Sequence, residues 1–169
     1  MKYMQNGGFQ THPLMRLTLL WTVLFLTGLW LTNFFFYFSK MGLTPDSVAN
    51  YYRGSEALFT QPRSFESMLE VTHFHLPMMA IVILILTHLL IFAPWSHRLK
   101  VWFISLTFGS AFIEEGSGWL VRFVHPDFAV VKIVSFLLFQ ALMAFLLVSL
   151  TLFLTSAART PSHPAHKKR

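Results

Sequence analysis

Residues 66–77 carry the side chains of this sequence that are best suited to chemistry. Glu70, His73 and His75 lie among apolar residues there, and His88 follows in the same hydrophobic run. Ionisable side chains within a membrane are costly, so they face a protein interior or a cavity and mark candidate functional sites. At about 100° per residue of a helix, Glu70 and His73 share a face with His88. His75 points nearly opposite His73.

A second group of ionisable side chains follows farther along the chain. Glu114 and His125 are eleven residues apart, nearly three helical turns, so they share a face if the helix is continuous. Glu115 and Arg122 are two turns apart on a neighbouring face, where we expect an ion pair. A break at residues 116–118, which read Gly-Ser-Gly, would spoil this register.

Histidines on hydrophobic helices predict binding of haem b. Neutral imidazoles from neighbouring helices ligate haem iron on both sides of the ring. The candidate outer pair is His73 or His75 together with His125. His88 lies roughly 20 Å along the helix axis from His75, a separation that suits a second haem near the inner side. Its partner ligand would come from another subunit or from a second copy of the chain.

A non-haem metal site is an alternative that uses the same region. Glu70 and His73 have the E-x-x-H spacing found in di-iron carboxylate bundles, although a complete site needs a second such motif. Zinc or copper held by His73, His75 and His125 is another possibility.

The third chemistry is a quinone or proton site near the outer interface. Glu114, Glu115, Arg122 and His125 are the candidate proton or quinone groups there, and this site would receive protons from a quinol. This chemistry combines with haem in a single function. The chain would then be a membrane electron-transfer subunit, exchanging electrons between quinone and an outer redox partner within a larger hetero- or homo-oligomeric complex.

Structural roles explain the same residues without a cofactor. Residues 67–70 form a capping-box pattern, in which Glu70 returns a hydrogen bond to the start of its helix. His88 is suited to hydrogen-bond a neighbouring helix, and we expect Lys132 to extend toward the outer surface. These roles predict a structural or assembly subunit. A small metal- or proton-coupled transporter is a further alternative.

Composition defines the class of protein that must position these groups. Of the 169 residues, 54% are hydrophobic and 12% are charged, whereas soluble domains carry about a quarter charged residues. The absence of cysteine excludes disulfides, thiolate metal sites and covalent haem attachment through a C-x-x-C-H motif. No phosphate-binding glycine loop, nucleophile elbow or HExxH motif supports hydrolytic or nucleotide-dependent activity.

Hydrophobic segments predict an all-α fold, a four-helix transmembrane bundle. A helix needs about 20 apolar residues to cross a bilayer, and four segments meet that length, at 17–38, 71–93, 101–124 and 128–158. We expect the first to be a retained anchor rather than a cleaved signal peptide. The membrane domain then covers residues 1–158, and the basic tail at 159–169 is expected to be disordered.

Positive residues predict the orientation. The net charge of +6 is spread over loops and tails, which indicates a topology signal rather than nucleic-acid binding. With four spans, three basic groups fall on one side and most of the acidic residues fall on the other. Both termini are therefore predicted to be cytoplasmic, in a bacterial inner membrane. The three basic groups are Lys2 with Arg16; His97, Arg98 and Lys100; and Arg159 with Lys167–Arg169.

One short helix is predicted in the outer loop between the first two spans. Thr44 is a suitable N-cap, Pro45 suits the first helical position, and Gly54 suits the C-terminal cap. Such a helix would lie on the membrane surface.

Overall fold

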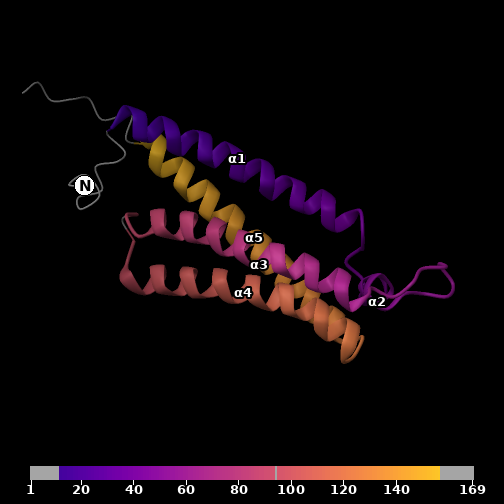
Figure 1. Ribbon diagram of the computed structural model, residues 1–169. Helices are drawn as coiled ribbons and strands as arrows, with labels where there is room; N and C mark the ends of the chain where they lie inside the picture. Colours follow the sequence, from indigo (N-terminus) through magenta and orange to yellow (C-terminus); the bar gives the residue numbers. More distant parts are fainter. Residues whose placement is uncertain (1–11, 94, 157–169) are drawn as a thin grey trace, which may run out of the picture.

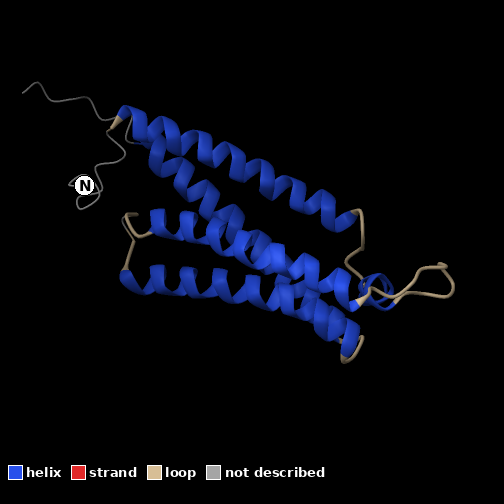
Figure 2. Cartoon of the chain, in the orientation of Figure 1, coloured by secondary structure: helices blue, strands red, loops and turns tan. Residues whose placement is uncertain are grey.

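The computed structural model describes residues 12–93 and 95–156 of the chain, and this part is helical (Figure 2). It contains five helices, of which four are long and one is short. They are α1 (Pro13–Phe38), α2 (Pro45–Arg53), α3 (Phe65–Leu90), α4 (His97–Phe123) and α5 (Phe128–Ser156). The tail predicted to be disordered, residues 159–169, lies outside the described residues.

Polar caps place the helix starts ahead of the apolar segments. The hydroxyl of Ser64 accepts a hydrogen bond from the Ser67 amide at the start of α3, and Ser96 caps α4 in the same way. Side chains of this type satisfy amides that the first helical turn leaves unpaired. Helices α3 and α4 therefore begin at residues 65 and 97, whereas the apolar segments start at 71 and 101. The N-cap is Ser64, so the predicted capping box at residues 67–70 is wrong.

The short helix predicted between the first two spans is confirmed as α2. Thr44 caps it by accepting a hydrogen bond from the Ser47 amide, and Pro45 occupies its first turn. It ends at Gly54, whose φ of 77° lies in the left-handed region that favours glycine. A Cβ at Gly54 would also come within 2.7 Å of the backbone of Thr60 and Pro62. Gly54 therefore turns the chain into the loop that leads to α3.

The four long helices alternate in direction along the chain. The start of α1 and the end of α5 lie at one end of the molecule, whereas α2 lies at the other (Figure 1). Helix α5 contacts each of the other four helices, and α1 packs chiefly against α5. Helix α5 is therefore the central element of the bundle.

Two clusters of buried apolar side chains hold the bundle together. One joins α1 and α4 to residues 82–90 of α3 and residues 139–154 of α5, with Leu26, Ile83 and Leu146 among its members. The other lies beside α2 and is centred on Tyr37 and Phe136, whose rings stack with centroids 3.8 Å apart. Packed aromatic pairs stabilise such contacts beyond their buried area. The second cluster fixes α2 over the C-terminal end of α1 and the N-terminal part of α5.

Three helices are long and apolar enough to cross a membrane, judged over the described residues. They are α1 (Pro13–Phe38), α3 (Phe65–Leu90) and residues Phe128–Thr155 of α5. Their outward faces carry exposed large apolar side chains, such as Phe25 at 74% and Phe35 at 75%. A lipid bilayer solvates such faces, whereas contiguous apolar surface of this extent is rare on soluble monomers. Helix α4 has the length of a span but also carries charged residues.

Candidate functional site

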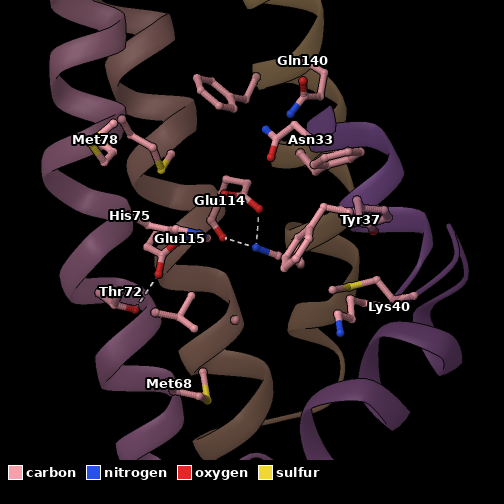
Figure 3. Close-up of a pocket in the computed structure, with 18 of the residues that line it drawn as sticks. Asn33, Tyr37, Lys40, Met68, Thr72, His75, Met78, Glu114, Glu115 and Gln140 are labelled. Atoms are coloured by element: carbon pink, nitrogen blue, oxygen red, sulfur yellow. Dashed lines mark hydrogen bonds and ion pairs between the residues drawn. The ribbon is translucent and has the colours of Figure 1, made fainter. Parts of the chain in front are cut away.

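A cavity of about 400 Å³ lies between α1 and α3 and is bounded by α4, α5 and α2 (Figure 3). Most of its wall is apolar or aromatic. Polar groups enter it at two levels, with Glu114, Glu115 and His75 in its middle and Asn33 and Gln140 toward one end. Ligand sites usually have this composition, in which a few placed polar groups orient a molecule held by apolar walls. The apolar wall includes Leu29, Trp30, Phe36, Met68, Val71, Met78, Met79, Val82, Phe136, Phe139 and Met143.

Lys132 lies inside the bundle, and the prediction that it extends toward the outer surface is wrong. The residue is 5% exposed. Its ammonium forms an ion pair with the Glu114 carboxylate and donates a hydrogen bond of 2.8 Å to the Glu114 carbonyl oxygen. A buried ammonium needs such a partner, because the loss of hydration is otherwise uncompensated. The pair therefore links α4 to α5 across the cavity wall.

Glu115 joins α4 to α3. Its carboxylate accepts a hydrogen bond of 2.5 Å from the Thr72 hydroxyl and lies 3.2 Å from Nδ1 of His75. The indole of Trp119 donates to the same Thr72 hydroxyl at 2.9 Å. Thr72 and His75 are three residues apart, so both reach Glu115 from one face of α3. An acid and an imidazole in contact, with His75 half-exposed, form a unit able to carry a proton.

Arg122 does not pair with Glu115, so that predicted ion pair is wrong. Its Nε donates a hydrogen bond of 2.7 Å to the carbonyl oxygen of Arg63, in the loop before α3. The guanidinium also lies over the ring of Phe123, 5.0 Å from the centroid. Arg122 thus anchors the loop between α2 and α3, while Glu115 remains available to Thr72 and His75.

Tyr52 covers the site from α2. Its hydroxyl approaches α4 so closely that a Cβ at Gly118 would lie 2.8 Å from the hydroxyl oxygen. Burial raises the pKa of the Tyr52 hydroxyl, with Lys132 acting in the opposite direction. The phenol therefore stays neutral beside the Lys132–Glu114 pair.

The remaining predicted residues lie outside this cavity. Glu70, His73 and His88 are exposed on α3. Helix α4 runs unbroken through residues 116–118 but ends at Phe123, so His125 lies in the following turn. There its Nδ1 is 3.3 Å from the Asp127 carboxylate. His125 therefore does not continue the helical face of Glu114, and the structure brings only His75 of the four histidines into the cavity.

The residues proposed for a metal site are not brought together. Within residues 12–93 and 95–156, no three His, Asp or Glu side chains are placed to hold a metal ion. His75 contacts Glu115, whereas His125 contacts Asp127 in a separate turn. The geometry thus offers two separate acid–imidazole pairs, of which only His75–Glu115 lies at the cavity, rather than a ligand cluster.

Sequence reasoning did not identify Thr72, Trp119 or Tyr52 as parts of the site. Thr72 carried a usable signal, since it lies three residues before His75 and shares its helix face. The ion pair of Lys132 also had a signal in the sequence. A single charge in an otherwise uncharged span requires a counter-charge, and Glu114 and Glu115 were available. Tyr52 carried none, because its position depends on how α2 folds back over α4.

The apolar spans and lipid-compatible faces define a helical membrane protein. Residues 42–161 match the family named Aq_1264_TM, described as a transmembrane helical domain, and the chain belongs to this family. The matched region includes His75, Glu114, Glu115 and Lys132. Comparison with curated proteins and with solved structures gives no match.

Proposed function

We propose that α4 is a fourth transmembrane helix and that both termini are cytoplasmic. Helix α4 lies against α3 and α5, and its 27 residues match the length of the three apolar helices. Both of its carboxylates are directed inward, where Lys132 neutralises Glu114 and α3 hydrogen-bonds Glu115. Charges that are paired or hydrogen-bonded inside the protein do not oppose insertion into the membrane, whereas charges that face lipid do. Orientation follows from the excess of basic residues in the terminal segments and the α3–α4 turn, as expected for a bacterial inner membrane.

We propose that the cavity binds a lipophilic ring of the quinone class and exchanges protons with it. The observation that carries this function is the His75–Glu115 contact at the wall of a mostly apolar cavity. Apolar walls suit a ring that partitions into the bilayer, whereas the paired acid and imidazole suit its oxygens. A purely structural polar group would need no such cavity beside it.

The chemistry divides between this chain and a partner. Reduction of a quinone to a quinol takes two electrons and two protons, and the reverse reaction releases them. His75 and Glu115 are positioned to supply or receive a proton at a ring oxygen. The electrons pass to or from a redox protein, so the chain acts as the quinone-binding membrane subunit of an electron-transfer complex.

Fluorescence tests this function, because Trp30 and Trp119 both line the cavity. Titration of the purified protein with a short-chain naphthoquinone should quench their emission in a saturable manner. The Trp30→Phe/Trp119→Phe double variant should lose this saturable component. Trp21→Phe is the matched control, because Trp21 is exposed on α1 and does not line the cavity. Linear quenching that is equal in all three proteins would reject the proposal and favour a structural subunit or a transporter.

Haem b is the second candidate cofactor, and the placement of His73 and His88 favours it. Both imidazoles are exposed on α3, fifteen residues and therefore about 22 Å apart along the helix. Another subunit or a second copy could supply the opposite ligand at each level. A reduced-minus-oxidised visible spectrum of the complex tests this. Sharp b-type bands that are lost in His73→Ala or His88→Ala would support haem, whereas bands unchanged in both variants would reject these ligands.

A further inference from the structure

Gln140 is a buried amide without a partner at one end of the cavity. It is 3% exposed on α5. Neither its Nε2 nor its Oε1 has a hydrogen-bond partner among the described residues. It lines the cavity, and Asn33 of α1 lies at the same end (Figure 3). A buried amide whose donor and acceptor are both unpaired destabilises a fold, so its presence calls for a role.

The surroundings hold Gln140 in this position. Its own backbone oxygen accepts a hydrogen bond of 3.1 Å from the indole of Trp30, which ties α1 to α5 at this level. Phe139 and Met143 on either side of it are buried in the core. The helix therefore cannot rotate to move the amide into the hydrocarbon of the bilayer without breaking these contacts.

We infer that the Gln140 amide binds an oxygen of the ring that occupies the cavity. This inference rests on the proposed quinone function and adds the group that recognises the ring. Nε2 donates to the carbonyl oxygen of a quinone, and Oε1 accepts from the hydroxyl of a quinol. A glutamine side chain offers both groups and does not titrate. The same residue therefore serves the oxidised and the reduced ligand.

The positions of the polar groups restrict the ligand further. Gln140 lies toward one end of the cavity, whereas His75 and Glu115 lie in its middle (Figure 3). A ring with oxygens on opposite edges can meet the amide on one side and the proton-exchanging pair on the other. This arrangement favours para-quinones over ortho-quinones, whose two oxygens lie on the same edge.

Gln140→Leu tests the inference, because leucine has a similar size and no polar atoms. We expect affinity for a short-chain para-naphthoquinone, followed by tryptophan quenching, to fall roughly tenfold, the loss expected for one buried hydrogen bond. The thermal stability of the ligand-free protein should rise, because an unpaired amide has been removed. A merely structural amide predicts the opposite result, with lower stability and unchanged affinity. The matched control is Thr107→Val, which removes a buried hydroxyl of α4 that does not line the cavity.

Infrared spectra of the bound quinone supply a second measurement. A carbonyl that accepts a hydrogen bond from Gln140 should show its stretching band shifted to higher frequency in Gln140→Leu, or in Gln140→Met should the leucine variant not fold. Failure of the native protein to bind any quinone would overturn the proposed function and this inference together. Binding by the native protein, with equal affinity and an unshifted carbonyl band in the variant, would overturn the inference alone.

Discussion

Lys132 of α5 and Glu114 of α4 form an ion pair that is almost sealed within the bundle. Their side chains are 7% and 14% exposed, respectively. The ammonium also donates to the carbonyl oxygen of Glu114, so the pair is held by the backbone as well as by charge. Because each charge is compensated by the other, neither is buried alone in the apolar interior of the bundle.

Removal of one member of this pair should destabilise the protein more than removal of both. Lys132→Met leaves Glu114 buried without its counter-charge, and we expect a loss of about 3–5 kcal/mol in the free energy of unfolding. The Lys132→Met/Glu114→Met double variant should recover most of this loss, because apolar side chains of similar volume replace the pair. Thermal unfolding of the detergent-solubilised protein, followed by circular dichroism, measures both effects. If the loss of unfolding free energy in the double variant equals the sum of the losses in Lys132→Met and Glu114→Met, the two side chains do not stabilise one another.

Gly118 should not tolerate a methyl group. Gly118→Ala places a Cβ 2.8 Å from the Tyr52 hydroxyl oxygen and 3.0 Å from two ring carbons, which should cost about 1–3 kcal/mol through overpacking. The matched control lies two residues earlier, because a Cβ at Gly116 meets nothing within 4 Å. Gly116→Ala should stabilise the helix by up to about 1 kcal/mol, since alanine is the better helix former. Equal melting temperatures for the two variants would contradict the packing of Tyr52 over α4.

Tyr52 should make stability depend on alkaline pH. Burial raises the pKa of its hydroxyl above the ordinary value of 10.0. Below pH 10 the phenol is neutral in the folded and in the unfolded protein. Above it the unfolded chain releases the proton first, so the contribution of neutral Tyr52 to stability is lost as pH rises toward the folded pKa. Chemical unfolding measured at a series of pH values should show a fall above pH 10 that is shallower in Tyr52→Phe. Identical slopes in the two proteins would contradict a buried hydroxyl.

The helices were largely predictable because they depend on local sequence. Hydropathy located the long helices, and Thr44, Pro45 and Gly54 located α2 through cap and turn chemistry that acts over a few residues. Hydropathy missed the polar first turns of α3 and α4, since Ser64 and Ser96 stabilise helix starts without being apolar.

The site was predictable only in part, because it depends on contacts between helices. Glu114, Glu115 and His75 stood out as ionisable residues in apolar surroundings. Their partners did not follow from sequence, since Glu115 is bound by Thr72 across a helix interface rather than by Arg122 on its own helix. Helical periodicity aligned Glu114 with His125, but α4 ends between them. Periodicity predicts a shared face only as far as the helix continues.

Single cysteines should establish whether α4 crosses the membrane. The chain has no native cysteine, so an introduced one is the only thiol available to a membrane-impermeant reagent. Suitable exposed positions are Leu58 in the outer loop, Leu99 at the start of α4 and Asp127 in the α4–α5 turn. With four spans and cytoplasmic termini, Leu58→Cys and Asp127→Cys should be labelled in intact spheroplasts, and Leu99→Cys only after permeabilisation. Asp127→Cys decides the question, because it would share the protected side with Leu99→Cys if α4 lay along the inner surface. Labelling of Leu99→Cys alone in intact spheroplasts would instead reverse the orientation and contradict the topology predicted from the basic residues.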